Sequence, residues 1–156
     1  MRSFSSVEEM DEHIISRWNS VVRPQDKVYH LGDVAMHRQH IQTMGRCNGH
    51  HRLVRGNHDL AAGDPPANWQ ISCVPEPQNH SSLCLCHDPE SCDGVGMAGH
   101  LHPVVRLRGP GRDSLRLPCF LLRRQVLILP AFSRFVDGRV LRMESEDRVF
   151  AVTEDR

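Results

Sequence analysis

The first clear pattern of hydrophobic and polar positions lies in Ser6–Val22 and predicts a helix. Its apolar side chains recur at steps of three and four, which places them on one stripe of a helix surface: Val7, Met10, Ile14, Trp18 and Val21. Ser6 and Glu9 have the spacing of a capping box, which satisfies exposed amides of the first helical turn. Arg23-Pro24 ends the predicted helix, because proline disfavours helical backbone in the residue before it.

Short apolar runs separated by polar turns follow this helix. Two of them predict strands, over Lys27–Leu31 and His51–Val54, with a short helix over His37–Met44 between them. The segments Arg55–Asp59 and Ala61–Asn68 are rich in Gly, Asn, Asp and Pro, so we predict loops there.

From Trp69 onward the pattern is mostly that of β-structure. Apolar or alternating runs, separated by turns such as Gly109-Pro110-Gly111, predict the strands Trp69–Val74, Ser82–Cys86, Gly96–Ala98, Val104–Leu107, Leu115–Leu122, Gln125–Leu129, Arg139–Met143 and Arg148–Val152. The length of 156 residues is typical of one domain. We therefore predict a single domain over residues 1–156, of the α+β (α/β) class.

Composition and charge narrow the class of protein. Hydrophobic residues make up 39% and charged residues 24%, which excludes a disordered chain. The 19 basic residues balance the 19 acidic ones, so no net charge attracts the chain to nucleic acid or to a membrane. No apolar run is long enough to cross a bilayer, and the N-terminal segment lacks the apolar core of a secretory signal. We expect a cytoplasmic protein with no membrane partner, and the oligomeric state stays open.

Histidine is unusually frequent, with 11 residues, and indicates metal chemistry. Most histidines outside the motifs described next, His51 among them, are expected in loops or at the surface. The six cysteines are expected to be reduced, since no secretory signal precedes them. A compact zinc clip is one alternative for four of these side chains, Cys84, Cys86, His87 and Cys92. Its spacing matches no standard zinc knuckle, and the apolar SLCLC context favours a buried strand.

Four segments share one layout, in which a short apolar strand leads directly into a loop that carries metal-ligand side chains. In chain order they are VYHLGD with Asp33, RLVRGNHD with Asn57 and His58, LCLCHDP with His87, and GMAGHLHP with His100 and His102. Ligands in open α/β sheets gather beyond the carboxyl ends of the strands. Oxygen and imidazole donors together suit Mn, Fe, Zn or Ni. We predict an extended backbone for His100-Leu101-His102, whose imidazoles could then serve two metals.

This ordered set of motifs resembles the calcineurin-like metallophosphoesterase superfamily over most of the chain. In the C-terminal half, the segments LCLCHDP, AGHLHPVVRLRG, RLPCFLL and LILPAFSRFVDG resemble the ligase-associated DNA damage response endonuclease family within it. The resemblance implies a metallophosphoesterase-type β-sandwich flanked by helices, with divalent transition metals, Mn²⁺ first among them, at one end of the sheets. It implies the hydrolysis of phosphodiesters, nucleic acid being one candidate substrate, by metal-activated water.

The resemblance also implies a role for each matching residue. The implied metal ligands are Asp33 as a bridge between two metals, Asn57, His87 and His100 at the second metal, and His102 at the first. His58 would contact the scissile phosphate and give a hydrogen bond or a proton to the leaving oxygen, and Asp59 would orient its ring. Two metals can together hold a phosphoryl oxygen and a hydroxide nucleophile.

One motif of the superfamily is missing from this sequence. Its members open with a strand that ends in Asp-x-His and supplies two ligands to the first metal. The string Asp11-Glu12-His13 lies inside the predicted helix, where its two ligand-type side chains point about 200° apart. We therefore expect a fold without that N-terminal strand, one complete and one partial metal site, and weak activity unless another segment completes the second site. The alternative is a truncated, catalytically impaired homologue that keeps one metal site and acts as a binding module.

A basic segment follows the GHLH motif directly. It contains Arg106, Arg108, Arg112, Arg116, Arg123 and Arg124. In VVRLR the arginines alternate with apolar residues, which on a strand places the guanidinium groups of Arg106 and Arg108 on one face. We predict that this face binds phosphates of a polyanionic substrate such as DNA, since guanidinium groups contact phosphate with two hydrogen bonds. A solvated strand face is the alternative.

Overall fold

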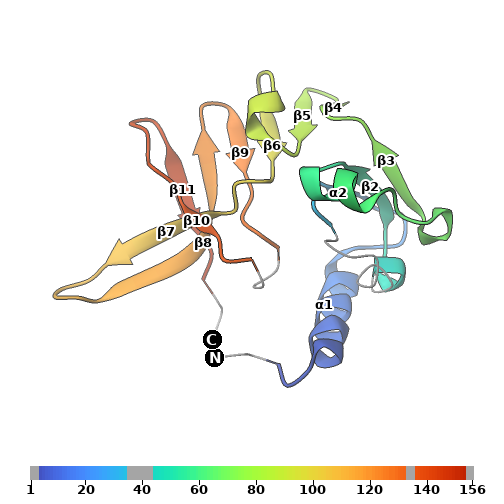
Figure 1. Cartoon of the computed structure of the whole chain (residues 1–156), viewed down its shortest axis with the longest axis horizontal. Coiled ribbons are helices and arrows are strands. Elements are labelled where there is room, and N and C mark those ends of the chain that lie inside the picture. Colours follow the sequence, from blue (N-terminus) through green and yellow to red (C-terminus); the bar gives the residue numbers. More distant parts are fainter. Residues whose placement is uncertain (1–3, 35–43, 133–135, 154–156) are drawn as a thin grey trace. The chain divides into compact units, whose positions relative to one another are not determined.

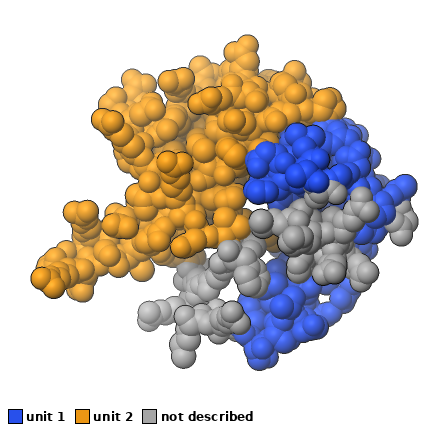
Figure 2. Space-filling model, in the orientation of Figure 1, with its two compact units in different colours: residues 1–74 blue, residues 75–156 orange. Residues whose placement is uncertain are grey.

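The computed structural model describes residues 4–34, 44–132 and 136–153 (Figure 1). It contains two compact units, residues 1–74 and residues 75–156 (Figure 2). Within the described residues, unit 1 holds two α-helices and a parallel sheet, and unit 2 holds a larger mixed sheet, so the predicted α+β class is confirmed. The single domain predicted for the whole chain stays a prediction. The helix predicted over His37–Met44 lies outside the described residues, except for Met44.

Helix α1 spans Val7–Val21 and confirms the first predicted helix. Ser6 caps it, because its hydroxyl oxygen accepts a hydrogen bond from the Glu9 N–H at 3.1 Å. The Glu9 carboxylate accepts the N–H of Ser5 at 2.8 Å instead of returning to Ser6. Only one half of the predicted capping box is therefore formed as expected.

The sheet of unit 1 contains three parallel strands in the order β1-β2-β3. Their bounds are Lys27–His30, His50–Val54 and Ile71–Val74. Lys27 pairs with His50, and His51 with Ile71. Since parallel strands end at the same edge of a sheet, the segments that follow β1 and β2 emerge there together.

Two short helical segments of unit 1 contradict the predicted loops. Helix α2 spans Asn57–Ala62, and the 3-10 turn η2 spans Ala67–Trp69, which delays the start of β3. Gly, Asn and Pro favour turns locally, but at α2 the Asp59 side chain caps the first turn of a helix. The buried carboxylate of Asp59 accepts the N–H of Gly56 at 2.9 Å, where α2 begins.

Two histidines and a tryptophan join α1 to the sheet within unit 1. His51, 4% exposed, is part of the core, so its predicted surface position is wrong. Its Nε2 lies 3.1 Å from the Cys47 carbonyl oxygen, which can only accept, so His51 donates there and its Nδ1 accepts from His30 Nε2 at 2.9 Å. Trp18 stacks on both rings and donates its Nε1–H to the Asn48 carbonyl at 2.8 Å. Trp18 of α1 thus packs on histidines of both β1 and β2.

We expect the free energy of unfolding to fall as the pH is lowered from about 6.5 to about 4. Burial, and then the neighbouring His51 ring, lower the pKa of His30 from 6.5 to about 4. Between these values the unfolded chain binds a proton that the folded His30 does not. The stabilisation, up to about 3 kcal/mol, is therefore complete above the unfolded pKa and is lost as the pH falls toward the folded one.

Thermal unfolding between pH 7 and pH 4 measures this effect. His30→Asn, which has no titratable ring, is expected to show a shallower dependence of Tm on pH than the wild type. An identical dependence in both proteins would exclude His30 as its source.

The sheet of unit 2 has the strand order β10-β7-β8-β9-β6-β5-β4, with β11 paired to β8. Its strands are β4 (Gln78–His80), β5 (Leu83–Cys86), β6 (Gly96–Ala98), β7 (Pro103–Arg108), β8 (Ser114–Arg123), β9 (Val126–Ile128), β10 (Arg139–Val140) and β11 (Arg148–Ala151). Seven of them confirm predicted strands, and β10 is shorter than predicted. β4 was missed because its sequence QNH has no apolar alternation. A 3-10 turn, η3 (Pro89–Ser91), connects β5 to β6.

The core of unit 2 lies where β5, β6, β8 and β9 meet. It is formed by Cys86, Ala98, Leu121, Val126 and Ile128. Cys86 pairs with Ala98, and Ala98 with Ile128, all in parallel register. The residues that follow β5 and β6, including His87 and His100, therefore leave the sheet at one edge.

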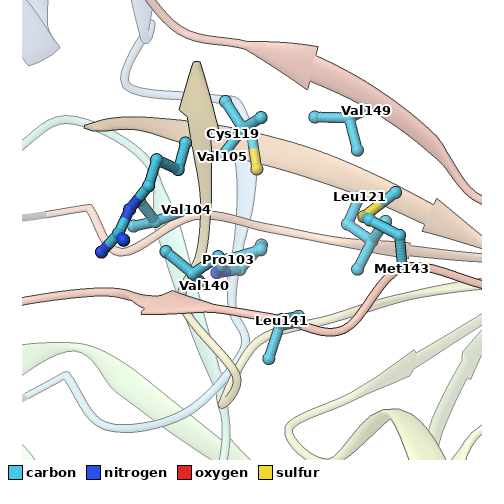
Figure 3. A pocket seen from close by; sticks show the side chains of 10 residues that line it. Pro103, Val104, Val105, Cys119, Leu121, Val140, Leu141, Met143 and Val149 are labelled. Atoms are coloured by element: carbon cyan, nitrogen blue, oxygen red, sulfur yellow. The ribbon is translucent and has the colours of Figure 1, made fainter. Parts of the chain in front are cut away.

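A small pocket between β7, β8 and the segment around β10 is lined mainly by apolar side chains (Figure 3). Val105, Cys119, Leu121, Leu141 and Val149 are among them. Its ten lining residues include no carboxylate and no histidine. None of the described helices combines the length and the apolar character that a membrane crossing requires.

Candidate metal centre

In unit 1, Asp33 lies in a left-handed turn just after β1. The φ angles of Gly32 and Asp33 are 87° and 55°. A residue other than glycine in this region costs about 1–3 kcal/mol, so surrounding contacts must hold it there. Asp59 supplies them, because its carboxylate accepts the N–H of Asp33 at 2.6 Å and that of Val34 at 3.2 Å.

The same carboxylate joins the Asp33 turn to the start of α2. Asp59 is 7% exposed and also accepts the N–H of Gly56. The His58 N–H donates to Asp33 Oδ1 at 3.0 Å, so the two segments are tied together twice. Unit 1 thus brings together three of the predicted residues, Asp33, Asn57 and His58, and the last two have exposed side chains. The predicted contact of Asp59 with the ring of His58 stays a prediction.

Replacing Asp59 with Asn is expected to lower the free energy of unfolding by about 2–4 kcal/mol, because an amide accepts these backbone N–H groups more weakly and adds a donor without a partner. Urea denaturation measures the change. Asp64→Asn is the matched control, since its ion pair with Arg55 is exposed and contributes at most about 1 kcal/mol. Equal losses in the two variants would contradict the positioning role of Asp59.

In unit 2, His87 and His100 follow the neighbouring parallel strands β5 and β6. His87 Nε2 lies 3.0 Å from His100 Nδ1, and His87 is 3% exposed. The Gly99 N–H donates to the His87 carbonyl at 3.0 Å and holds the two strand ends together. Two nitrogens bound to one metal at adjacent positions also lie about 3 Å apart, because metal–nitrogen bonds are about 2.1 Å long. This imidazole pair therefore fits a single metal ion.

His100 and His102 lie in a tight turn, so the extended backbone predicted for them is wrong. Their φ angles are 63° and 44°, and the Leu101 N–H donates to the Gly99 carbonyl at 2.7 Å. The His102 carbonyl accepts the Arg139 N–H at 2.9 Å. The six non-glycine residues with positive φ in the described part of the chain include three predicted ligands, Asp33, His100 and His102. Backbone strain of this kind is concentrated at functional sites.

Sequence reasoning missed one residue that positions the backbone at His87. Both the His87 N–H and the Asp88 N–H donate to Glu76 Oε1 at 2.7 Å. Glu76 thereby fixes the backbone at the point where β5 ends. Nothing in the sequence marks this role, because its partners are backbone groups eleven and twelve residues away.

Taken together, the predicted ligands supply a carboxylate, an amide and imidazoles. This donor set suits a divalent transition metal and does not favour a metal selected by thiolates. The string Asp11-Glu12-His13 does not add to it, because α1 contains all three residues, as the sequence predicts.

The alternative zinc clip forms only in part. The sulfur atoms of Cys84, Cys86 and Cys92 lie within 4.8 Å of one another, whereas the His87 ring faces His100. Burial raises the pKa of Cys86 well above its usual value and that of Cys92 to about 11. These thiols are therefore neutral near pH 7.

Arg106 and Arg108 lie on β7 with exposed side chains. Arg106 pairs directly with Arg116 on β8, and Arg108 with Ser114, so three guanidinium groups share one face of this hairpin. Within the described residues, neither Arg106 nor Arg108 forms an ion pair. Arg123, from the same basic segment, instead pairs with Asp147 at 2.6 Å.

No family model matches the chain. An uncharacterized protein of Methanocaldococcus jannaschii, MJ1445, is 42% identical over 158 residues, which cover 90% of this chain and 84% of that protein. The crystal structure of Pseudomonas putida nuclease MPE matches with a TM-score of 0.74 and 33% identity, over 94% of this chain and 78% of the nuclease chain. The chain belongs to the family of these two proteins.

The match to nuclease MPE also supports the predicted fold. The nuclease has a metallophosphoesterase-type fold, which supports the superfamily resemblance of the sequence. The match covers 94% of this chain and so includes residues of both units. The particular resemblance of the C-terminal half to the ligase-associated endonucleases stays a prediction.

Proposed function

We propose that this protein is a metal-dependent phosphodiesterase that cleaves nucleic acid by metal-activated water. The match to nuclease MPE over 94% of the chain carries this proposal. The strained turns at Asp33, His100 and His102 support it independently, since they hold ligand-type side chains at the ends of strands.

The proposed ligands of one metal are Asp33, Asn57, His87 and His100, and those of a second are Asp33 and His102. Mn²⁺ is the first candidate, with Fe, Zn and Ni as alternatives, because the donors are oxygen and imidazole nitrogen. Such a metal supplies Lewis-acid activation of water and of a phosphoryl oxygen. The remaining chemistry falls to side chains.

His58 is the proposed proton donor to the leaving oxygen. Its side chain is exposed, so a substrate can reach it, while its N–H bond to Asp33 fixes its backbone. Asp59 positions both residues by holding the Asp33 turn at the start of α2. Proton donation of this kind contributes about 10²–10⁴-fold to a rate.

Hydrolysis of a chromogenic phosphodiester by metal-depleted protein, with Mn²⁺, Ni²⁺, Zn²⁺ or Mg²⁺ added back, tests the proposed function. We expect turnover with at least one transition metal, with Mn²⁺ best, and none in chelator. Asn57→Ala is expected to abolish the turnover. Hydrolysis that persists in chelator, or no hydrolysis with any of the four ions, would refute the proposal.

The arginine face of the β7–β8 hairpin is the proposed substrate-binding surface. Arg106 and Arg108 have no acidic partner among the described residues. A third guanidinium group lies opposite on Arg116, 3.9 Å from the exposed carboxylate of Asp137. Like charges placed directly opposite each other are unfavourable in a sheet unless an anion lies between them. Nucleic acid phosphates supply such anions.

Replacing both Arg106 and Arg108 with Ala is expected to weaken DNA binding about tenfold at low salt. The dependence of log K on log salt concentration should also become shallower, its slope decreasing in magnitude by about 2, since two phosphate contacts are lost. Fluorescence anisotropy over a salt series measures both quantities. The control, Arg17→Ala with Arg23→Ala, removes the same charge elsewhere. If both double variants lose binding equally, or neither does, the face is only solvated.

A further inference from the structure

Three thiols gather inside unit 2, apart from the side chains of the proposed metal centre. Cys84 and Cys86 are two residues apart on β5, so they project to the same face of the sheet. Cys92 ends the η3 turn and reaches back over that strand. All three sulfur atoms lie within 4.8 Å of one another.

A glycine makes room for the third thiol. Gly96 pairs with Cys84 across β5 and β6. A Cβ atom on Gly96 would lie 2.1 Å from the Cys92 sulfur and 2.4 Å from the Cys84 carbonyl oxygen, which no side chain could accommodate without displacing them. The sulfur of Cys92 therefore packs directly against the backbone of Gly96.

The cluster is shielded on one side and accessible on the other. Cys86 is 0% and Cys84 5% exposed, whereas Cys92 is partly exposed. The Cys92 thiol donates to the Cys84 carbonyl at 3.6 Å, and the Cys86 thiol to the Met97 carbonyl at 3.7 Å. An ion could therefore enter beside Cys92 and keep one solvent ligand.

The donor chemistry selects the class of ion. Three sulfur donors favour thiophilic d¹⁰ ions and disfavour Mn²⁺ and Mg²⁺. Thiolates at the Zn–S distance of about 2.3 Å are separated by about 3.8 Å in a tetrahedral site. The sulfur atoms thus need to move inward by no more than about 1 Å, which side-chain rotation can provide.

We propose that Cys84, Cys86 and Cys92 form a binding site for one zinc-class ion, Zn²⁺ or its analogue Cd²⁺. On binding, each thiol loses its proton to solvent and forms one metal–sulfur bond, and no electron is transferred. The ion ties the η3 turn to β5, directly before His87, and so stabilises unit 2. This site is independent of the proposed hydrolytic centre.

Titration of the reduced, metal-free full chain with Cd²⁺ tests this site, because cadmium–thiolate bonds give an ultraviolet charge-transfer band. We expect a band of three-thiolate intensity that saturates at one equivalent, and competition by Zn²⁺ but not by Mn²⁺. Absence of this band in the wild type would overturn the proposal, whatever the variants do. Loss of the thiols to a disulfide within the cluster under these reducing conditions would also overturn it.

Matched serine variants locate the ion. Cys92→Ser is expected to weaken Cd²⁺ binding at least a hundredfold, because a hydroxyl of similar size is a poor ligand for a soft ion. Cys73→Ser, at a partly exposed thiol outside the cluster, should leave binding unchanged. Circular dichroism verifies that both variants are folded, and Cys92→Ala serves if the serine variant is not. Equal Cd²⁺ affinity in wild type and folded Cys92 variants would contradict the site.

Discussion

Replacing His100 with Ala is expected to lower metal-dependent phosphodiester hydrolysis at least a hundredfold and to weaken Mn²⁺ binding by a similar factor. The reason is the imidazole pair of unit 2, where His100 Nδ1 lies 3.0 Å from His87 Nε2. Loss of a group that only supports a metal ligand already costs about 10–100-fold, so loss of a ligand should cost no less. Steady-state hydrolysis and calorimetric Mn²⁺ titration measure the two effects.

Two further variants separate the loss of the ligand from the loss of the turn. His100 has a φ of 63°, where alanine is strained and glycine is not. His100→Gly removes the imidazole without this strain and should be as inactive as His100→Ala. His80→Ala, an exposed histidine on β4, is the control and should retain activity. Wild-type hydrolysis and Mn²⁺ affinity in His100→Gly would remove His100 from the proposed ligand set.

The second large effect is expected at His58, where alanine should lower kcat by about 10²–10⁴-fold while Mn²⁺ affinity stays unchanged. The hydrogen bond that His58 gives to Asp33 comes from its backbone N–H, so Ala retains it. The ring alone is lost. Calorimetry with Mn²⁺ and turnover of the same preparation distinguish this variant from Asn57→Ala, which should lose metal binding as well.

The leaving group makes the test of His58 sharper. A nitrophenolate leaves readily without a proton, whereas a nucleic acid alkoxide does not. His58→Ala should therefore impair cleavage of DNA more than cleavage of a nitrophenyl diester. An equal loss on both substrates, or a parallel fall in Mn²⁺ affinity, would exclude proton donation as the role of His58.

Hydrophobic periodicity predicted much of the fold. The stripe of α1 and the apolar runs of the strands are local features that survive in the folded chain, so these elements are found close to their predicted bounds. Two failures have a common cause. α2 begins in a Gly-Asn segment that favours a turn, and it is held by Asp59 through amides on two different segments. The turn at His100 depends similarly on backbone bonds to Gly99 and Arg139. No local pattern encodes the contacts of Asp59 with Asp33 or of Arg139 with His102.

The candidate site, like the fold, could be predicted from the sequence only in part. Ligand types and their order along the chain are visible in the sequence, because metal chemistry restricts the residues that can serve. The backbone contacts that position the ligands are not, since Glu76 and Asp59 accept hydrogen bonds from N–H groups that every residue type except proline carries. His51 is a further case, because its burial accompanies a hydrogen bond with His30 that only the pairing of β1 with β2 creates.

Anomalous diffraction from crystals grown with Mn²⁺ tests most directly whether both units supply ligands to one hydrolytic centre. We predict an anomalous peak bonded to Asp33 and Asn57 of unit 1 and to His87 and His100 of unit 2, with bonds of about 2.0–2.2 Å. Absence of a peak at saturating Mn²⁺, or a peak whose ligands come from other residues, would contradict the proposed metal centre.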